Sequence, residues 1–140
     1  MATVFSRIIH GELPARFVWH DERCVAFLSV APLKPGHTLV VPREEVDHWL
    51  DLPSPAMQHL AHVSHCVGRA IQDEWQPVKV GTTVLGLEVP HVHIHVVPIW
   101  EPHDLDFGNA DHAARAEDLD DAARRLRGAL RRHGHPETAD

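Results

Sequence analysis

The stretch VPHVHIHVVP, residues 89–98, carries three histidines at alternate positions, with an aliphatic residue between each pair. Such alternation is typical of a β-strand, because successive side chains point to opposite faces of a sheet. A strand would place His91, His93 and His95 together on one face, open to solvent, and the aliphatic residues on the other face. Valine or threonine would suit a half-exposed strand better than histidine, so a purely structural role is the weaker interpretation.

Two kinds of site remain open for these histidines. Alternate side chains lie about 7 Å apart along a strand, which suits groups that grip successive atoms of one ligand. Neutral imidazole is the commonest metal ligand, but imidazoles can also bind phosphate oxygens while one of them acts as nucleophile or acid. A second stretch, PLKPGHTLVVP (residues 32–42), adds His37 at the start of another expected strand, from which it could reach the other three across the sheet.

The composition restricts the classes of function. A chain of 140 residues is close to the commonest domain size, so one domain with one core is expected. The formal net charge of -7 argues against a nucleic acid as partner, although not against a single nucleotide in a pocket. No apolar run is long enough to span a bilayer, and the N-terminus lacks the pattern of a signal peptide. Cys24 and Cys66 stand alone, without a disulfide framework or a CxxC pair, so a cytoplasmic protein with reduced thiols is expected.

Hydrophobic periodicity and turn residues predict the secondary structure. A short helical turn is expected at residues 6–10. Two longer helices are expected at 54–75 and 113–132, and residues 133–140 should be frayed. Five strands are expected, over residues 16–21, 24–30, 37–42, 78–86 and 91–97. Strands in runs with two separate helices predict an α+β fold with a mainly antiparallel five-stranded sheet and two main helices.

Most of the other histidines are expected to be solvated. The chain has 14 histidines in all. Those among loop-type residues should lie in solvent, namely His10, His20, His48, His103 and His112. His59, His62 and His65 recur every third residue of the first long helix, and we expect them on a solvated helix face rather than at a metal site.

Three stretches together resemble the histidine triad (HIT) superfamily of nucleotide hydrolases and transferases. They are FSRIIHGELPA (residues 5–15), DERCVAFLSVAPLKPGHTLVVP (21–42) and HVHIHVVP (91–98), and they follow the order and spacing of that family over about residues 4–100. The form GLEVPHVHIHVVPI, followed by an irregular tail and a final helix over 101–132, is similar to a bacterial branch of general HIT proteins. The resemblance implies a single HIT domain over residues 1–140 and a sheet that continues across a homodimer.

The resemblance also implies a reaction at the α-phosphorus of a nucleoside phosphate derivative. His93 would be the nucleophile and form a nucleotidyl-histidine that water then hydrolyses. His95 would contact the phosphate and assist the leaving group, while His91 and His37 would orient and support the nucleophile. The positions implied to bind the nucleotide are Val4, Phe5, Ile8, Phe27, Ser29 and Val30. No cofactor is implied, and the expected partner is a small nucleotide substrate, with no nucleic acid and no membrane.

The chain departs from the family pattern at several positions. The zinc-binding members have cysteines where this chain has Thr3 and Ser6, and a histidine where it has Glu45, so no metal site is expected. Ser29 stands at the position of a ribose-binding aspartate, and it can make fewer contacts to a diol. In the loop before the triad, Leu87 cannot donate to a phosphate oxygen, and a charged residue follows it.

The sequence therefore leaves three functions open. The leading one is an enzyme that cleaves a nucleoside phosphoramidate, an adenylylated small molecule or a dinucleotide polyphosphate. The second is a nucleotide-binding or sensing protein with little turnover, which the departures at Ser29 and Leu87 favour. The third is a metalloenzyme lined by histidines.

Overall fold

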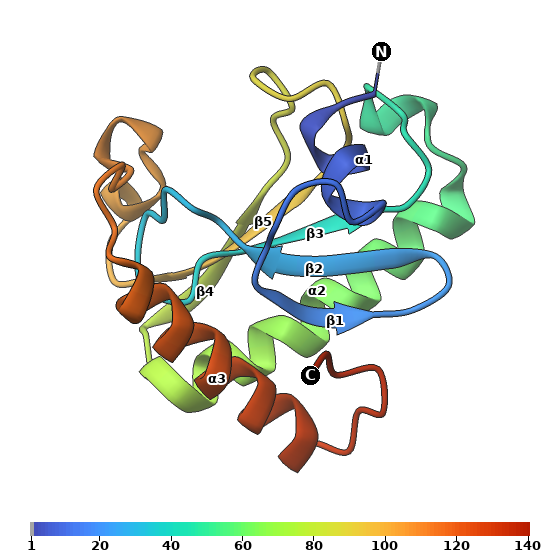
Figure 1. The fold of residues 1–140 in the computed structure, drawn as a ribbon. Coiled ribbons are helices and arrows are strands. Elements are labelled where there is room, and N and C mark those ends of the chain that lie inside the picture. Colours follow the sequence, from blue (N-terminus) through green and yellow to red (C-terminus); the bar gives the residue numbers. More distant parts are fainter. Residues whose placement is uncertain (1) are drawn as a thin grey trace.

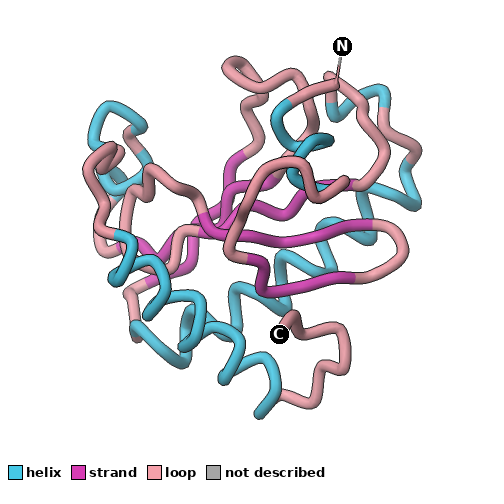
Figure 2. The backbone as a smooth tube through the Cα atoms, in the orientation of Figure 1, coloured by secondary structure: helices cyan, strands magenta, loops and turns pink. Residues whose placement is uncertain are grey.

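Five antiparallel strands form one sheet in the computed structural model, which describes residues 2–140. The strand order is β1-β2-β3-β5-β4. The strands are β1 (Phe17–His20), β2 (Cys24–Leu28), β3 (Thr38–Pro42), β4 (Lys79–Thr83) and β5 (Ile94–Ile99). Figure 1 shows the sheet crossing the molecule, with the loops gathered at its two ends (Figure 2). The α+β architecture with a five-stranded antiparallel sheet, predicted from the sequence, is confirmed.

Helices cover both faces of this sheet. They are α1 (Val4–Ile9), α2 (Ser54–Trp75) and α3 (Ala116–Arg132), with short 3₁₀ turns at Trp49–Asp51, Pro102–Leu105 and Phe107–Asn109. In Figure 1, α2 runs behind the sheet, α1 lies in front of it, and α3 packs beside α2. No helix in the described part of the chain is long and apolar enough to cross a membrane.

The alternation of side chains along the strands separates two hydrophobic clusters. Cys24, Ala26 and Leu28 of β2 belong to the large core beneath α2 and α3. Val25 and Phe27, the residues between them, belong to a smaller cluster beneath α1. Both sets are buried, because each face of the sheet has its own cover. The active-site candidates lie on the face that α1 covers.

The first long helix has the predicted bounds, and the second begins later than predicted. Pro53 is the N-cap of α2, and the Ser54 hydroxyl inside the helix accepts a hydrogen bond from Gln58 at 3.1 Å. The last helix begins at Ala116 and not at residue 113. Its acidic first turn and basic last turn complement the helix dipole, as the sequence indicates.

The fifth strand begins three residues later than predicted. His91 and His93 precede β5 rather than forming its first half. The backbone there bonds to loops instead of a strand: Val92 N donates to Val46 O at 2.8 Å, and His91 N donates to Val89 O at 2.8 Å. Only His95 of the three histidines lies within the regular ladder, opposite Leu39 of β3.

The expectation of a frayed C-terminus is wrong. The last residues pack along the free edge of β1, which is visible beneath that strand in Figure 1. His20 N donates to Glu137 O at 2.9 Å, Ala139 N donates to Val18 O at 3.0 Å, and Ala139 is buried. An edge strand has unpaired backbone groups, and this tail satisfies some of them.

Candidate functional site

Four histidines meet on the α1 face of the sheet, where β3 and β5 lie side by side. His37 precedes β3, and its position follows from the turn at Pro35 and Gly36. Gly36 has a φ of +96°, and a Cβ there would lie 2.9 Å from the Trp75 ring, so both the backbone and the space favour glycine. His37, His91, His93 and His95 are all buried, with at most 8% of any side chain exposed. The expectation that the triad lies on an open face is therefore wrong.

Two hydrogen bonds fix the protonation of the His91 ring. Its Nε2 lies 2.8 Å from the backbone carbonyl oxygen of Pro42, which can only accept, so Nε2 carries the proton. Burial lowers the pKa of His91, which favours the neutral ring. Its Nδ1 is then an acceptor, and the hydroxyl of Thr3 donates to it at 2.8 Å.

His93 is left with one nitrogen free. Its Nδ1 lies 2.7 Å from the carbonyl oxygen of His91, so Nδ1 carries the proton. Burial lowers the pKa of His93 too, and the neutral ring has its lone pair on Nε2. The Phe5 ring packs edge-on against the imidazole, with ring centroids 4.8 Å apart. The geometry therefore presents a neutral imidazole nitrogen that is available as a nucleophile.

A hydrogen bond from His37 places the proton of His95 on the other ring nitrogen from that of His93. The backbone N–H of Leu33 donates to Nδ1 of His37 at 3.0 Å, which leaves the His37 proton on Nε2. That proton is donated to Nδ1 of His95 at 3.0 Å, which leaves the His95 proton on its own Nε2. Burial, together with the neighbouring His93, lowers the pKa of His37 to about 4 and that of His95 to about 3. Both rings are therefore neutral at pH 7.

The site thus holds a free lone pair next to a free N–H. The rings of His93 and His95 lie 4.7 Å apart between centroids. Among residues 2–140, the fully buried side-chain polar atoms that lack a partner are Ser64 Oγ and Glu137 Oε1, so the Nε2 atoms of His93 and His95 reach the surface. Such a pair can attack an electrophile with one nitrogen and stabilise negative charge with the other.

Three of the six residues implied to bind a nucleotide lie together, and one of them, Phe5, packs against His93. Phe5, Ile8 and Phe27 form part of the apolar cluster beneath α1. Val4 and Val30 lie outside that cluster, with 40% and 71% of their surface exposed.

The Ser29 hydroxyl is partly engaged by the backbone, and Leu87 is exposed to solvent. The Ser29 hydroxyl accepts a hydrogen bond from the backbone N–H of Ala31 at 3.3 Å, which uses part of the capacity that a ribose would need. Leu87, in the loop before the triad, is 89% exposed.

Phe107 lies at the site, although the sequence does not predict its contact with the histidines. Its ring packs edge-on against His95 with centroids 4.7 Å apart, and it lies 6.3 Å from His37. The surrounding tail is fastened to the loop before His37, because Lys34 pairs with Asp104 at 3.3 Å. An aromatic residue in an irregular acidic tail carries no local pattern that predicts this contact.

Thr3, Ser6 and Glu45, which stand where zinc-binding members have ligands, form a hydrogen-bonded cluster. Glu45 Oε1 accepts from the backbone N–H of Thr3 and from the hydroxyl of Ser6, both at 2.7 Å. These bonds lower the pKa of Glu45 and keep it ionised at neutral pH. The fourth member of the cluster is His91, through Thr3.

A second group with metal-binding side chains lies at the turn between β1 and β2. Donor atoms of Asp21, Cys24 and His59 lie within 4.8 Å of one another. However, the Asp21 carboxylate already accepts bonds from Trp19 Nε1, from His59 Nε2 and from two backbone N–H groups. Burial and Asp21 raise the pKa of the Cys24 thiol well above its usual range. We therefore interpret the group as a hydrogen-bonded clamp.

The expectation that His59 lies on a solvated helix face is wrong. His59 is half-buried and bonded to Asp21 at 2.7 Å, so it is not part of a solvated face, whereas His62 and His65 are exposed. The five histidines expected in solvated loops are all exposed.

Comparison with known proteins places this geometry in a family. The sequence profile described as HIT domain matches residues 10–101. An uncharacterised HIT-like protein from Methanocaldococcus jannaschii is 31% identical over 134 residues, which are 89% of this chain and 98% of that protein. An adenylylsulfatase from Arabidopsis thaliana is 26% identical over 135 residues, covering 93% of this chain and 68% of the relative.

The solved structures agree with the sequence relatives. A hypothetical histidine triad nucleotide-binding protein from Sulfolobus tokodaii superposes with a TM-score of 0.78 at 27% identity, over 91% of each chain. The four converging histidines, the five-stranded sheet and the profile match over most of the chain lead to one conclusion: the chain belongs to the HIT family of nucleotide-binding proteins and hydrolases.

Proposed function

We propose that the protein is a nucleotide hydrolase or transferase that attacks the α-phosphorus of a nucleoside phosphate conjugate through His93. The observation that carries the proposal is the tautomer of His93. Its Nδ1–H is held by the carbonyl of His91, which leaves the lone pair on Nε2, and the ring lies 4.7 Å from that of His95 between centroids. The candidate substrates are phosphoramidates, adenylylated small molecules and dinucleotide polyphosphates.

The first step forms a covalent intermediate. The Nε2 lone pair of His93 attacks the α-phosphorus, the N–P bond forms, and the bond to the leaving group breaks with its electron pair going to the leaving group. The Nε2–H of His95 donates to the phosphate oxygen or to the leaving atom and stabilises the developing charge. Because Nδ1 of His93 keeps its proton, the phosphorylated ring is cationic, and the His91 carbonyl stabilises that charge.

The second step releases the nucleotide. A water molecule attacks the same phosphorus, an O–P bond forms, and the N–P bond breaks as the electron pair returns to Nε2 of His93. The water proton passes to solvent. Dividing one displacement into two lowers the barrier of each step. The phosphorylated ring is cationic, so His93 leaves as a neutral imidazole, which is a good leaving group. The likeness to an adenylylsulfatase supports this class of reaction.

A nucleotide-binding protein with little turnover is the second candidate. It is favoured by the Ser29 hydroxyl, which is engaged with the backbone of Ala31, and by Leu87, which offers no donor to a phosphate. Both features weaken contacts with the substrate and leave the nucleophile unchanged.

Turnover distinguishes the two candidates. The protein is incubated with a panel of nucleotide conjugates, one from each substrate class, and release of nucleoside monophosphate is followed. His93→Ala is the test variant, and His65→Ala, on the exposed face of α2, is the matched control. Release that needs His93 and not His65 supports the enzyme. Tight binding of nucleotide without release by the unmodified protein supports the sensor, and activity that chelation abolishes and added metal restores would support a metalloenzyme.

A further inference from the structure

A chain of hydrogen bonds runs from the Glu45 carboxylate to the reactive histidine. Glu45 Oε1 accepts from Thr3 N and from Ser6 Oγ, both at 2.7 Å. Thr3 Oγ1 contacts Nδ1 of His91 at 2.8 Å, and the carbonyl of His91 accepts from Nδ1 of His93 at 2.7 Å. The chain therefore connects the N-terminus of α1 and the loop after β3 to His93.

The partners of each group indicate where the protons of this chain lie when the His91 ring is neutral. The hydroxyl of Ser6 donates to the carboxylate, and the backbone N–H of Ser6 donates to Thr3 Oγ1 at 3.0 Å. Thr3 Oγ1 is thus an acceptor on one side, and its single proton is free for Nδ1 of His91. The other nitrogen of His91 must donate, since its partner is the carbonyl of Pro42. With the His91 ring neutral, as its burial favours, this arrangement satisfies all these groups.

The segment that carries His91 and His93 needs such an anchor. It precedes β5, and it is held by single backbone bonds to Val46 and Val89 rather than by a strand ladder. The His91 side chain is fully buried, so its two ring bonds are made away from water. A buried ring nitrogen without a partner costs the free energy of its lost hydration, which would favour a rotated ring and a shifted carbonyl.

We propose that Thr3, held by Glu45, is a positioning residue for His93. It fixes the tautomer and orientation of His91, and the carbonyl of His91 in turn holds the proton of His93 on Nδ1. This inference rests on the proposed function, in which His93 is the nucleophile. If Thr3 only capped α1, substituting it would lower stability and would leave the proton of His93 on Nδ1.

The test combines ring ¹⁵N chemical shifts with steady-state kinetics on the full chain. Thr3→Val removes the donor to His91, and Thr3→Ser restores it. In Thr3→Val, the shifts of His91 and His93 should show mixed tautomers, and kcat should fall about tenfold with KM within about twofold, the effect of losing one hydrogen bond. Thr3→Ser should return both the shifts and kcat to those of the unmodified protein.

Glu45 supplies a second variant that does not depend on Thr3 variants folding. Glu45→Ala removes the acceptor behind Thr3 and should move the His91 shifts in the same direction as Thr3→Val, with a smaller fall in kcat. Glu44→Ala is the matched control, because Glu44 is an exposed neighbour with the same charge. It should leave the shifts and kcat unchanged.

The outcomes separate the two proposals. Unchanged tautomers in Thr3→Val and Glu45→Ala, or a Thr3→Ser variant as impaired as Thr3→Val, would overturn the positioning role. The chemical shifts need no substrate, so they report on it even for a protein that does not turn over. Full turnover by His93→Ala would overturn the proposed function instead.

Discussion

His93 and His95 differ in which ring nitrogen carries the proton. Backbone groups determine this difference. The carbonyl of His91 holds the proton of His93 on Nδ1, and the N–H of Leu33, acting through His37, leaves the proton of His95 on Nε2. The sequence identifies which histidines form the group, because their spacing and order are local. It does not identify their tautomers, since these depend on backbone atoms that come from distant segments.

The role of His37 leads to the first prediction. Gln at this position can donate to Nδ1 of His95 and accept from Leu33 N, whereas Phe can do neither. His37→Gln should keep kcat within about fivefold of the unmodified protein, and His37→Phe should lower it by about a hundredfold, because a buried Nδ1 would lose its donor. Steady-state kinetics on both variants checks this. Equal activity of the two would show that the bond to His95 has no part in the reaction.

At the scale of elements, the sequence predicts most strands and helices to within a few residues. Short apolar runs bounded by turn residues mark β1, β2 and β3, and a helical period marks α2. The start of β5 is displaced because the loop that contains Val46 takes the backbone of Val92 away from the sheet. Such a contact between distant loops leaves no periodic signal in either segment. The same reason hides the packing of Phe107 on His95.

The C-terminal tail gives the second prediction. Its polar and small residues resemble those of a frayed end, yet they pair with β1. Deleting residues 135–140 should lower the free energy of unfolding by about 1 to 3 kcal/mol, since it exposes the edge of β1 and the surface around Trp19. Chemical denaturation measures the loss. Deleting the exposed Asp140 alone is the control, and equal stability of the two truncated chains would contradict the role of the tail.

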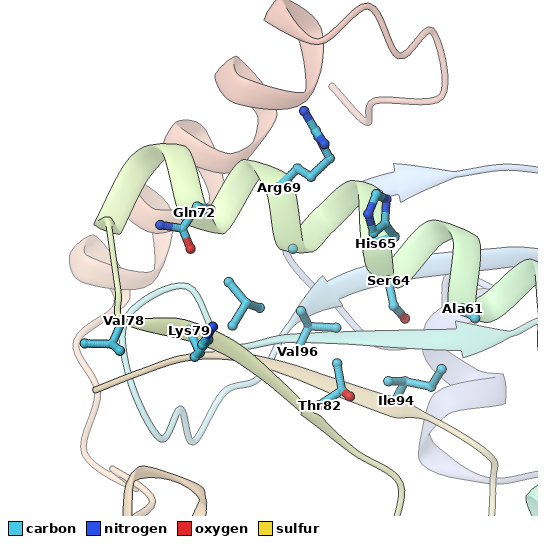
Figure 3. A pocket seen from close by; sticks show the side chains of 12 residues that line it. Ala61, Ser64, His65, Arg69, Gln72, Val78, Lys79, Thr82, Ile94 and Val96 are labelled. Atoms are coloured by element: carbon cyan, nitrogen blue, oxygen red, sulfur yellow. The ribbon is translucent and has the colours of Figure 1, made fainter. Parts of the chain in front are cut away.

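At the scale of the whole molecule, β4 is an unprotected edge. Among the described strands it pairs with β5 alone, and it borders a cavity of about 660 Å³ between α2 and the sheet. Figure 3 shows Ser64 pointing into this cavity and Ile94 and Val96 on its floor, and the Ser64 hydroxyl is buried without a partner. An exposed edge beside an apolar cavity is typical of an association surface.

The third prediction is therefore a homodimer formed through β4 and α2. Sedimentation at micromolar concentration should give about twice the 15.7 kDa of one chain. Ala61→Arg places a charge at the rim of the cavity and should shift the protein toward monomer, whereas Ala113→Arg, at an exposed site outside it, should not. A stable monomer of the unmodified protein would contradict this prediction.

The buried histidines make stability depend on pH. Because burial lowers the pKa of His37 to about 4 and of His95 to about 3, the unfolded chain binds more protons than the folded one below pH 6.5. Their contribution to stability is complete above pH 6.5 and is lost as the pH falls toward 4. The free energy of unfolding should therefore decrease on acidification, by up to about 1.4 kcal/mol per pH unit for each buried histidine.

Denaturation with urea at several pH values between 7 and 4.5 measures this slope. His95→Gln should give a shallower slope, because one group no longer titrates on unfolding. A profile that is flat between pH 6.5 and 4.5, or a slope that His95→Gln leaves unchanged, would mean that these rings are not held neutral by the fold.

In the proposed reaction His93 becomes covalently bonded to the nucleotide, and rapid quench with mass spectrometry detects this adduct. The protein is mixed with a substrate from the class that it turns over, quenched within milliseconds and digested. The predicted result is an acid-labile added mass of one nucleotidyl group on the peptide that contains residues 89–98, absent in His93→Ala and retained in His65→Ala. Turnover without such an adduct, or an adduct that persists in His93→Ala, would contradict the role of His93 as nucleophile.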